Sequence, residues 1–398
     1  MNGKNKLKIA FIGWAESIHV ERWVKWFASH GHEVHLISNS YKDIKGVKVH
    51  TLREAAENAA NGGVGKLSKI GALWADLKFN YLSYLRYPGY IRKTRQLLRV
   101  IRPDIVQGFF VGFAGYIGAA SGFHPLMVYT GGADLNIFAR RFLMHKICTK
   151  LTLPRIDLLL HPSEEANSLA VSMGMAAEKS AFVHLGVDLQ RFNSNIDATD
   201  FKKRLGIDGC PVVLSTRCLY DRFYNISGLL RSFALVLQKM PNARLIMKYY
   251  SGHEKGKLMQ LAKELNISEK TIWVGVGDYA DMPLYYNAAD AFVSLSFTDS
   301  GSVSLLEAMA CGCAPIVSRM KNTGEWIKDG YNGRLVEPND QPGAAQAILD
   351  VLSDQDQRAL YGKRNIEIII NRADQEKNFR KIEEYACQLV SQSKACSK

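Results

Sequence analysis

The chain has 398 residues, of which 47% are apolar and 22% are charged, and its formal net charge is +13. This length allows two domains with cores of their own, and the apolar content excludes an intrinsically disordered chain. The seven cysteines are scattered and form no C-x-x-C pair, which excludes a dense disulfide framework and a clustered zinc site.

The chain starts with the charged sequence MNGKNK, which runs directly into a strand-like segment without a small-residue cleavage site. This start is not that of a secretory leader. We therefore expect a cytoplasmic protein that carries reduced thiols.

Seven short apolar segments in the first half of the chain predict β-strands. They read LKIAFIG (7–13), EVHLIS (33–38), VKVHTL (47–52), DIVQGFF (104–110), LMVYT (126–130), DLLLHP (157–162) and AFVHL (181–185). Helix-like segments separate these strands. In the first of them Val20, Trp23, Val24 and Phe27 recur at helical spacing, and Gly31 follows where a helix commonly ends.

Residues 105–123 carry no charge and could be interpreted as a membrane span. Glycines interrupt the segment, and its character changes from strand-like to rich in small residues. A buried strand, a glycine-rich loop and a buried helix of a parallel sheet explain this pattern better.

Residues 66–155 concentrate the positive charge, with 14 Lys and Arg against 3 Asp and no Glu. Trp and Tyr are interleaved with these cations over residues 66–102. This mixture favours either a surface for anionic lipid headgroups or a solvated helix face whose aromatic side chains enter the core. A nucleic-acid surface is disfavoured, because no nucleic-acid-binding signature accompanies the charge.

Six further strands are predicted after a polar linker near residues 190–200. They read PVVLSTR (211–217), ARLIMKY (243–249), TIWVG (271–275), DAFVSLS (290–296), APIVS (314–318) and GRLVEP (333–338). Strands that alternate with helical crossovers predict an α/β fold of two Rossmann-like parallel-sheet domains, with a ligand-binding cleft between them.

The sequence DSGSVSLLEAMA begins at Asp299 and joins a buried strand to a helix. Ser302 is a suitable N-cap and Gly312 a suitable terminator for that helix. Unpaired amides at such a helix start attract an anion such as a diphosphate. Carboxylates beside it, Asp299 and Glu307, suit neutral sugar hydroxyl groups instead. A ligand with both features is a nucleotide-sugar.

Residues 299–340 resemble the E-x7-E region of GT-B retaining glycosyltransferases of family 4, the group 1 glycosyltransferases. Four other blocks match the order and spacing of that family, so the resemblance covers most of the chain: HVERWVKWFASHGHEVHLIS (19–38), YTGGADL (129–135), HLGVDLQRF (184–192) and STRCLYDRFYNISGLLRSFALV (215–236).

The resemblance implies roles for particular residues. Glu307 would bind the donor ribose, and Asp299 would face the transferred sugar. Arg217 would neutralise the diphosphate, and Gly13 would allow close approach of the backbone to the reaction centre. The backbone of four further residues would contact the sugar and phosphate: Ser300, Gly301, Ser302 and Val303.

This chain departs from the family pattern at three places. The first Glu of the family is Asp299 here. The second basic residue of the donor site has Arg222 as its nearest candidate, although Tyr224 and Asn225 could occupy that place. The His of the family's THG block is Gly131, followed by Gly132; Asp134 in this block would contact a substrate or cap the next segment.

We expect residues 1–190 to form an acceptor-binding domain and residues 200–373 a nucleotide-sugar-binding domain. The apolar spacing of the last segment predicts a helix, and the resemblance implies that it crosses back to the first domain over about 374–393. No metal-binding pattern is present in the sequence, so we expect no permanently bound cofactor and no metal.

The leading hypothesis is a retaining transferase that moves a sugar from a UDP- or GDP-sugar to a glycan or lipid-linked acceptor in cell-surface polysaccharide or glycolipid biosynthesis. It would work at the inner face of the membrane, where residues 66–102 would contact anionic lipid. The same chemistry on a soluble acceptor, or a non-catalytic nucleotide-sugar-binding protein, are the alternatives. An NAD-dependent oxidoreductase is disfavoured, because no G-x-G-x-x-G follows the first strand.

Overall fold

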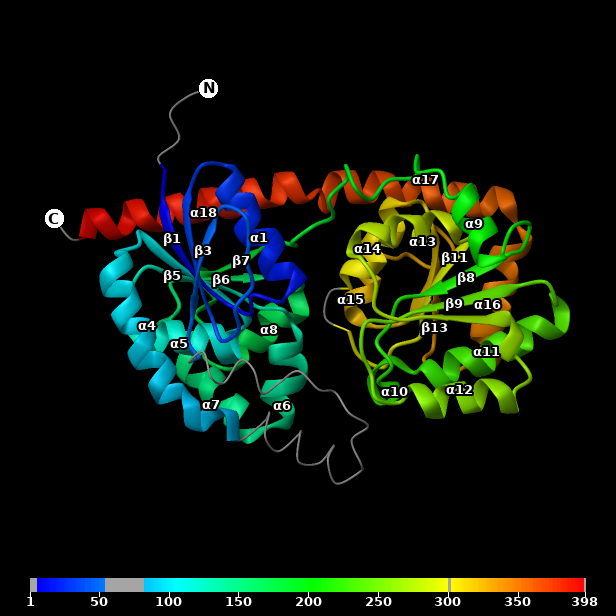
Figure 1. Ribbon diagram of the computed structural model, residues 1–398, viewed down its shortest axis with the longest axis horizontal. Helices are drawn as coiled ribbons and strands as arrows, with labels where there is room; N and C mark the ends of the chain where they lie inside the picture. Colours follow the sequence, from blue (N-terminus) through cyan, green and yellow to red (C-terminus); the bar gives the residue numbers. More distant parts are fainter. Residues whose placement is uncertain (1–5, 54–81, 300–301, 397–398) are drawn as a thin grey trace. The chain divides into compact units, whose positions relative to one another are not determined.

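The computed structural model describes residues 6–53, 82–299 and 302–396. The chain divides into two compact units (Figure 1). Unit 1 contains residues 1–184 and 378–398, and unit 2 contains residues 185–377.

Unit 1 is built on a parallel sheet with the strand order β3-β2-β1-β4-β5-β6-β7 among its described residues. The strands are β1 (Lys8–Ile12), β2 (Glu33–Ser38), β3 (Val47–Thr51), β4 (Ile105–Phe109), β5 (Leu126–Tyr129), β6 (Leu158–His161) and β7 (Ser180–Phe182). The longer helices around it are α1 (Ile18–Ser29), α4 (Tyr87–Ile101), α5 (Tyr116–Ser121), α7 (Leu143–Thr152) and α8 (Glu164–Ser172).

Short helical turns complete unit 1. They are η2 (Leu82–Arg86), η3 (Phe110–Gly115), η4 (Asp134–Phe138), α6 (Ala139–Arg141), η5 (Leu153–Arg155) and η6 (Ala177–Lys179). The C-terminal helix α18 (Gln375–Cys396) packs on this unit over the part that belongs to it. Phe379 meets Trp26 edge to face, and His32 Nε2 lies 3.0 Å from Glu383 Oε1.

Alternate residues of β1 face two different helical layers, as strand geometry requires. Phe11 packs against Trp23 and Phe27 of α1. Ala10 and Ile12 belong instead to the apolar cluster that includes α4 and α5. Both faces of the sheet are therefore covered, as expected for a parallel sheet.

Unit 2 repeats this plan with the strand order β10-β9-β8-β11-β12-β13 in its described part. The strands are β8 (Val212–Ser215), β9 (Arg244–Lys248), β10 (Thr271–Val274), β11 (Ala291–Ser294), β12 (Ala314–Ser318) and β13 (Arg334–Val336). Its helices and helical turns are α9 (Thr199–Leu205), α10 (Asp221–Tyr224), α11 (Ile226–Lys239), α12 (Lys255–Glu264), η7 (Ser268–Lys270), η8 (Tyr279–Asp281), α13 (Met282–Ala288), α14 (Val303–Ala310), α15 (Lys321–Gly324), α16 (Gln341–Ser353) and α17 (Gln355–Arg372).

The sheet of unit 2 also lies between two apolar layers. Val213 of β8 packs in the cluster that includes α11 and α16. Its neighbours Val212 and Leu214 pack in the cluster of α13 and α14. The predicted α/β class with two Rossmann-like parallel sheets is confirmed.

Every predicted strand is present within a few residues of its expected bounds. The predicted first helix is also confirmed, with Gly31 just past its end at φ 89°. Residues 105–123 form β4, η3 and α5, so the expected glycine-rich loop is a π-helical turn instead. In the described ranges, none of the helices combines the length and the apolar character needed to cross a membrane.

Both sheets reverse their strand order beside their first strand. This switch point lies between β1 and β4 in unit 1 and between β8 and β11 in unit 2. In open parallel sheets, ligands bind at the carboxyl ends of the strands that flank such a point. The residues that follow these four strands are therefore the first candidates for a functional site.

Candidate functional site

Arg217 lies at the switch point of unit 2, where several polar side chains hold its guanidinium. Its Nε donates to Ser294 Oγ at 2.7 Å, and its NH2 donates to Ser302 Oγ at 2.7 Å and to Asp299 Oδ2 at 2.5 Å. The side chains of Arg217 and Asp299 are only 11% and 12% exposed. The structure therefore brings three of the predicted residues together, in one partly buried ion-pair network.

Ser302 caps α14, as predicted, by accepting a hydrogen bond from the Leu305 amide at 3.2 Å. Val303 is the first residue of that helix, and Gly312 follows its end at φ 78°. Ser300 and Gly301 lie outside the described residues. The described part of this turn places the positive end of a helix dipole beside the Arg217 network.

Glu307 is buried in the second turn of α14, with 4% of its surface exposed. The hydroxyl groups of two tyrosines donate to its carboxylate, Tyr279 to Oε1 and Tyr286 to Oε2, the latter at 3.0 Å. Burial and the neighbouring Glu307 raise the pKa of Tyr286, so this tyrosine stays a hydrogen-bond donor. The carboxylate is therefore oriented from two sides, which restricts the directions from which a ligand hydroxyl can reach it.

Arg222 does not join the Arg217 network. It is exposed on α10, with its guanidinium carbon 4.6 Å from the ring centroid of Phe223. The alternative residues nearby have other contacts: the Tyr224 ring lies under Arg217 at 5.6 Å, and Asn225 caps α11 through the Gly228 amide.

Gly13 follows β1 at the switch point of unit 1, where helix α1 approaches closely. A Cβ at this position would lie 3.1 Å from a methyl group of Val20. The missing side chain therefore allows α1 to pack against the end of the strand. The backbone amide of Gly13 donates to Ile37 O at 3.2 Å.

Gly131 follows β5, and the ring of Phe110 occupies the space beside it. A Cβ at residue 131 would lie 2.6 Å from that ring, so the ring stands where a side chain at this position would begin. Phe110 itself has φ 78°, which is strained for a bulky residue. The absence of the family's His at position 131 is thus coupled to an aromatic side chain from the neighbouring strand end.

Asp134 is 4% exposed and stabilises the turn that carries Phe110. Its Oδ2 accepts from the Val111 amide and its Oδ1 from Thr130 Oγ1, both at 2.7 Å. The neighbouring Gly132 has φ 83°, and its amide donates to Thr130 Oγ1. Burial raises the pKa of Asp134, whereas these hydrogen bonds oppose the change. The structure therefore gives Asp134 a positioning contact with the β4–η3 turn.

Sequence reasoning missed the tyrosines that orient Glu307 and the serine that holds Arg217. Tyr279 and Tyr286 come from η8 and α13, and Ser294 is the last residue of β11. The only signal available for them was the position of Ser294 at the carboxyl end of a predicted strand. Among the described residues, no group of three or more His, Cys, Asp or Glu side chains is arranged to hold a metal ion.

Two family models match the chain in adjoining ranges. The model described as Glycosyltransferase Family 4 matches residues 17–191, and the model described as Glycosyl transferases group 1 matches residues 197–381. Together they cover both sheets and both switch points.

The chain is also similar to curated proteins over about half of its length. It is 27% identical to an N-acetyl-alpha-D-glucosaminyl L-malate synthase of Bacillus anthracis over 52% of this chain and 56% of that protein. It is 27% identical to an alpha-monoglucosyldiacylglycerol synthase of Streptococcus pneumoniae over 52% of this chain and 48% of that protein. The chain thus spans about half the length of the curated relatives it matches.

Solved structures share the fold over nearly the whole chain. HepE of Anabaena in complex with UDP-glucose has a TM-score of 0.75 at 17% identity, covering 96% of this chain and all of that one. Sucrose-phosphate synthase of Thermosynechococcus elongatus has a TM-score of 0.79 at 19% identity, covering 97% and 100%. With the two family matches, these similarities show that the chain belongs to the group 1 glycosyltransferases of family 4, which have the GT-B fold.

Proposed function

We propose that this protein is a retaining glycosyltransferase that transfers a sugar from a nucleoside-diphosphate sugar, a UDP- or GDP-sugar, to a glycan or lipid-linked acceptor. Family membership supports glycosyl transfer. The curated relatives are named for malate and diacylglycerol products, and one structural neighbour binds UDP-glucose. This range of names favours a role in cell-surface polysaccharide or glycolipid biosynthesis.

One observation carries the donor proposal: Arg217 is fixed at the switch point of unit 2 by Ser294, Asp299 and Ser302. A guanidinium held in one orientation forms directional hydrogen bonds to phosphate oxygens. The helix start at Val303 adds backbone amides and a favourable dipole for the same anion. Residues 300 and 301 would contribute further amides to the diphosphate.

Glu307 would bind the ribose of the donor. A carboxylate accepts hydrogen bonds from two adjacent hydroxyl groups, and its buried position next to the anion site suits a ribose on the nucleoside side of the diphosphate. Tyr279 and Tyr286 would keep the carboxylate in the orientation that this contact requires.

Asp299 would act on the transferred sugar and on Arg217 together. When the bond between the anomeric carbon and the diphosphate oxygen breaks, the electron pair stays on the diphosphate and positive charge develops at the sugar. Arg217 would stabilise the first charge and Asp299 the second. Prearranged charges of this kind are the largest catalytic term in many enzymes.

Each unit would take one substrate. Unit 2 would bind the nucleotide-sugar, with residues 200–373 as its predicted domain. Unit 1 would bind the acceptor, with residues 1–190 and the C-terminal helix as its predicted domain. Gly13 and the Gly131–Asp134 turn flank the switch point of unit 1, where an acceptor hydroxyl would be presented.

A peripheral membrane contact would deliver a lipid-linked acceptor. The described part of the proposed surface, residues 82–102, exposes Leu85 at 77% and Val100 at 83%, with exposed arginines between them. Helix α7 adds a second stripe, because Leu143, Ile147 and Leu151 are 64%, 42% and 45% exposed at four-residue spacing. Exposed cations follow the same helix at Lys146 and Lys150. Apolar side chains flanked by cations suit an anionic membrane surface.

Cosedimentation with anionic vesicles tests this membrane contact. The protein should sediment with phosphatidylglycerol vesicles at low salt and not with phosphatidylcholine vesicles. The Ile147→Gln/Leu151→Gln variant should lose most of this binding, whereas Val171→Gln, at a comparably exposed position of α8, should retain it. Equal binding of the two variants would rule out α7 as the contact.

A donor panel tests the enzymatic proposal. Thermal shifts with UDP-, GDP- and ADP-sugars should single out one nucleotide, because a ligand that binds only the folded state raises the melting temperature. Incubation of that donor with acceptor extracts should then release the nucleoside diphosphate. Binding without any release would favour the alternative of a non-catalytic nucleotide-sugar-binding protein.

A further inference from the structure

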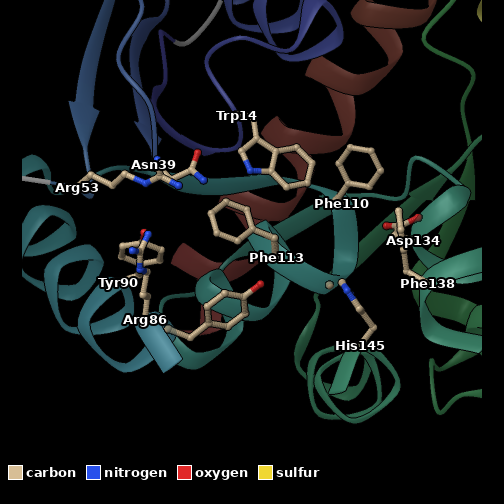
Figure 2. Close-up of a pocket in the computed structure, with 12 residues that line it drawn as sticks. Trp14, Asn39, Arg53, Arg86, Tyr90, Phe110, Phe113, Asp134, Phe138 and His145 are labelled. Atoms are coloured by element: carbon tan, nitrogen blue, oxygen red, sulfur yellow. The ribbon is translucent and has the colours of Figure 1, made fainter. Parts of the chain in front are cut away.

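Unit 1 contains a cavity of about 300 Å³ at the carboxyl ends of its central strands (Figure 2). Its lining residues follow β1 to β5 or belong to the neighbouring helices: Trp14, Asn39, Arg53, Arg86, Tyr87, Tyr90, Phe110, Gly112, Phe113, Asp134, Phe138 and His145. A cavity of this size reaches the lower end of the range of small-molecule sites.

The chemistry of the cavity changes along the strand order of the sheet. Arg53 follows β3, Asn39 follows β2, Trp14 follows β1, and Phe110 follows β4. Figure 2 shows the same sequence in space: Arg53 and Asn39 lie at one end, Trp14 and the phenylalanines at the centre, and His145 at the other end. The cavity therefore has a cationic end and an apolar body.

Aromatic rings form the body of the cavity. Trp14 stacks on Phe113 with ring centroids 5.3 Å apart and an interplanar angle of 8°, and its centroid lies 5.1 Å from that of Phe110. The Asp134 carboxylate fixes the turn between the two phenylalanines through the Val111 amide. This aromatic wall is thus built into the backbone and is prepared to contact a flat or extended apolar group.

The polar groups at the cationic end are not used by the fold. Arg53 Nε and Tyr90 Oη are buried and have no hydrogen-bond partner within the described residues. Such groups are costly unless a ligand or water satisfies them. Arg86 adds a second positive charge to the lining.

The other end of the cavity contributes little opposing charge. Burial lowers the pKa of His145 to about 4, so its ring is neutral at pH 7. The carboxylate of Asp134 already accepts from Val111 and Thr130. The arginines therefore determine the electrostatic preference of the cavity, and that preference is for an anion.

We propose that this cavity binds the acceptor of the reaction, and that the acceptor is an amphiphilic organic phosphate or carboxylate. Its apolar group lies between Trp14 and Phe113, and its anionic group is bound at the Arg53 end. This inference rests on the proposed function, because it assigns the substrate class of the unit that does not bind the donor. A prenyl phosphate and a soluble aryl phosphate share the required chemistry.

Calorimetric titration of the full-length protein with three soluble probes tests the proposal. Phenyl phosphate should bind at least about tenfold more tightly than phenol or inorganic phosphate, since one charge-assisted hydrogen bond accounts for that factor. Equal affinities for phenyl phosphate and phenol would overturn the anionic assignment. Equal affinities for phenyl phosphate and inorganic phosphate would overturn the apolar assignment.

Two variants locate the binding. Arg53→Gln should weaken phenyl phosphate about tenfold and leave phenol unchanged. Phe113→Ala should weaken both aromatic probes. Arg99→Gln, at an exposed position of α4, is the matched control and should bind as the wild type does. Unchanged affinity in Arg53→Gln and Phe113→Ala would place the probe elsewhere and contradict the proposal.

Farnesyl phosphate distinguishes the two sources of the anion. Affinity well above that of phenyl phosphate would identify a lipid phosphate as the acceptor, and equal affinity would identify a soluble aromatic one. A parallel titration with UDP reports on unit 2 and serves as a folding control. If UDP binds but no phosphate probe does, this inference fails while the proposed donor site stands; if UDP fails to bind, the proposed function fails instead.

Discussion

The two sheets have the same strand order around their switch points, but opposite chemistry at the carboxyl ends of the strands. In unit 2, a partly buried ion pair of Arg217 and Asp299 and the capped start of α14 meet beside the switch point. In unit 1, aromatic rings from Trp14 and Phe110 occupy the equivalent place. The fold provides the location in both cases, whereas the side chains decide which ligand is bound.

The difference extends to the use of buried carboxylates. Glu307 in unit 2 accepts only from tyrosine hydroxyl groups in the contacts given above, and such groups can exchange with ligand hydroxyls. Asp134 in unit 1 accepts from the backbone of Val111 and stabilises a strained turn. A carboxylate at a strand end can therefore serve binding in one unit and architecture in the other.

Replacement of Arg217 should give the largest effect. Arg217→Ala should lower kcat/KM by about 10³-fold, because a fixed cation at the leaving diphosphate is lost. Arg217→Lys should lose somewhat less, since a lysine cannot contact Ser294, Ser302 and Asp299 together in one plane. Steady-state kinetics with the selected donor measure both. Near-normal activity of Arg217→Ala would remove the donor site from this switch point.

Asp299→Asn should separate turnover from binding. The substitution removes the negative charge that would face the developing positive charge of the sugar, so kcat should fall about 10²-fold. The dissociation constant for the nucleoside diphosphate should stay the same or improve, because a carboxylate near the phosphates is gone. A large loss of nucleotide affinity with kcat retained would contradict this assignment.

Glu307→Gln should weaken donor binding about tenfold to a hundredfold, the range for hydrogen bonds to a charged group. Glu307→Ala should lose most donor binding. Tyr279→Phe keeps the carboxylate but removes one of its orienting donors, and it should have a smaller effect in the same direction. Calorimetric titration with the nucleotide measures all three variants.

Asp134→Ala should affect stability and leave nucleotide affinity unchanged. The substitution leaves the buried Val111 amide without its acceptor, which should lower the free energy of unfolding by about 2 kcal/mol. Asp43→Ala, at an exposed position of the same unit, should cost little. Chemical denaturation of both variants provides the comparison, and equal stability would show that the β4–η3 turn does not depend on this carboxylate.

His145 should give the smallest effect, a pH dependence of stability. Its pKa is about 4 in the folded chain, below its ordinary value of 6.5, so the unfolded chain binds the proton more readily. Stability from this group is therefore complete above pH 6.5 and falls as the pH decreases toward 4. The drop in melting temperature from pH 7 to pH 5 should be smaller in His145→Gln than in the wild type. The exposed control His253→Gln should behave as the wild type does.

The fold could be predicted from the sequence because buried parallel strands leave a strong apolar signal. The segments ending at Gly13 and Ser38, for example, are nearly continuous runs of apolar residues bounded by turn formers. The cap at Ser302 was equally local, since one side chain and the three residues after it determine it. Such features need no knowledge of distant contacts.

The rest of the site depends on contacts between segments far apart in the sequence. Tyr286 reaches Glu307 across 21 residues, and Ser294 reaches Arg217 across 77. The turn at Phe110 could not be foreseen either, because its positive φ is stabilised by Asp134 from the next strand end. Arg222 illustrates the converse: its position along the chain suggested a donor contact, whereas the structure places it on Phe223 and outside the Arg217 network.

The most direct measurement is a crystal structure of the protein with the UDP- or GDP-sugar that it prefers. The account predicts density for the diphosphate within hydrogen-bonding distance of Arg217 and the Val303 amide, with the ribose at Glu307. A nucleotide found in the aromatic cavity, stacked between Trp14 and Phe113, would contradict the assignment of the two switch points.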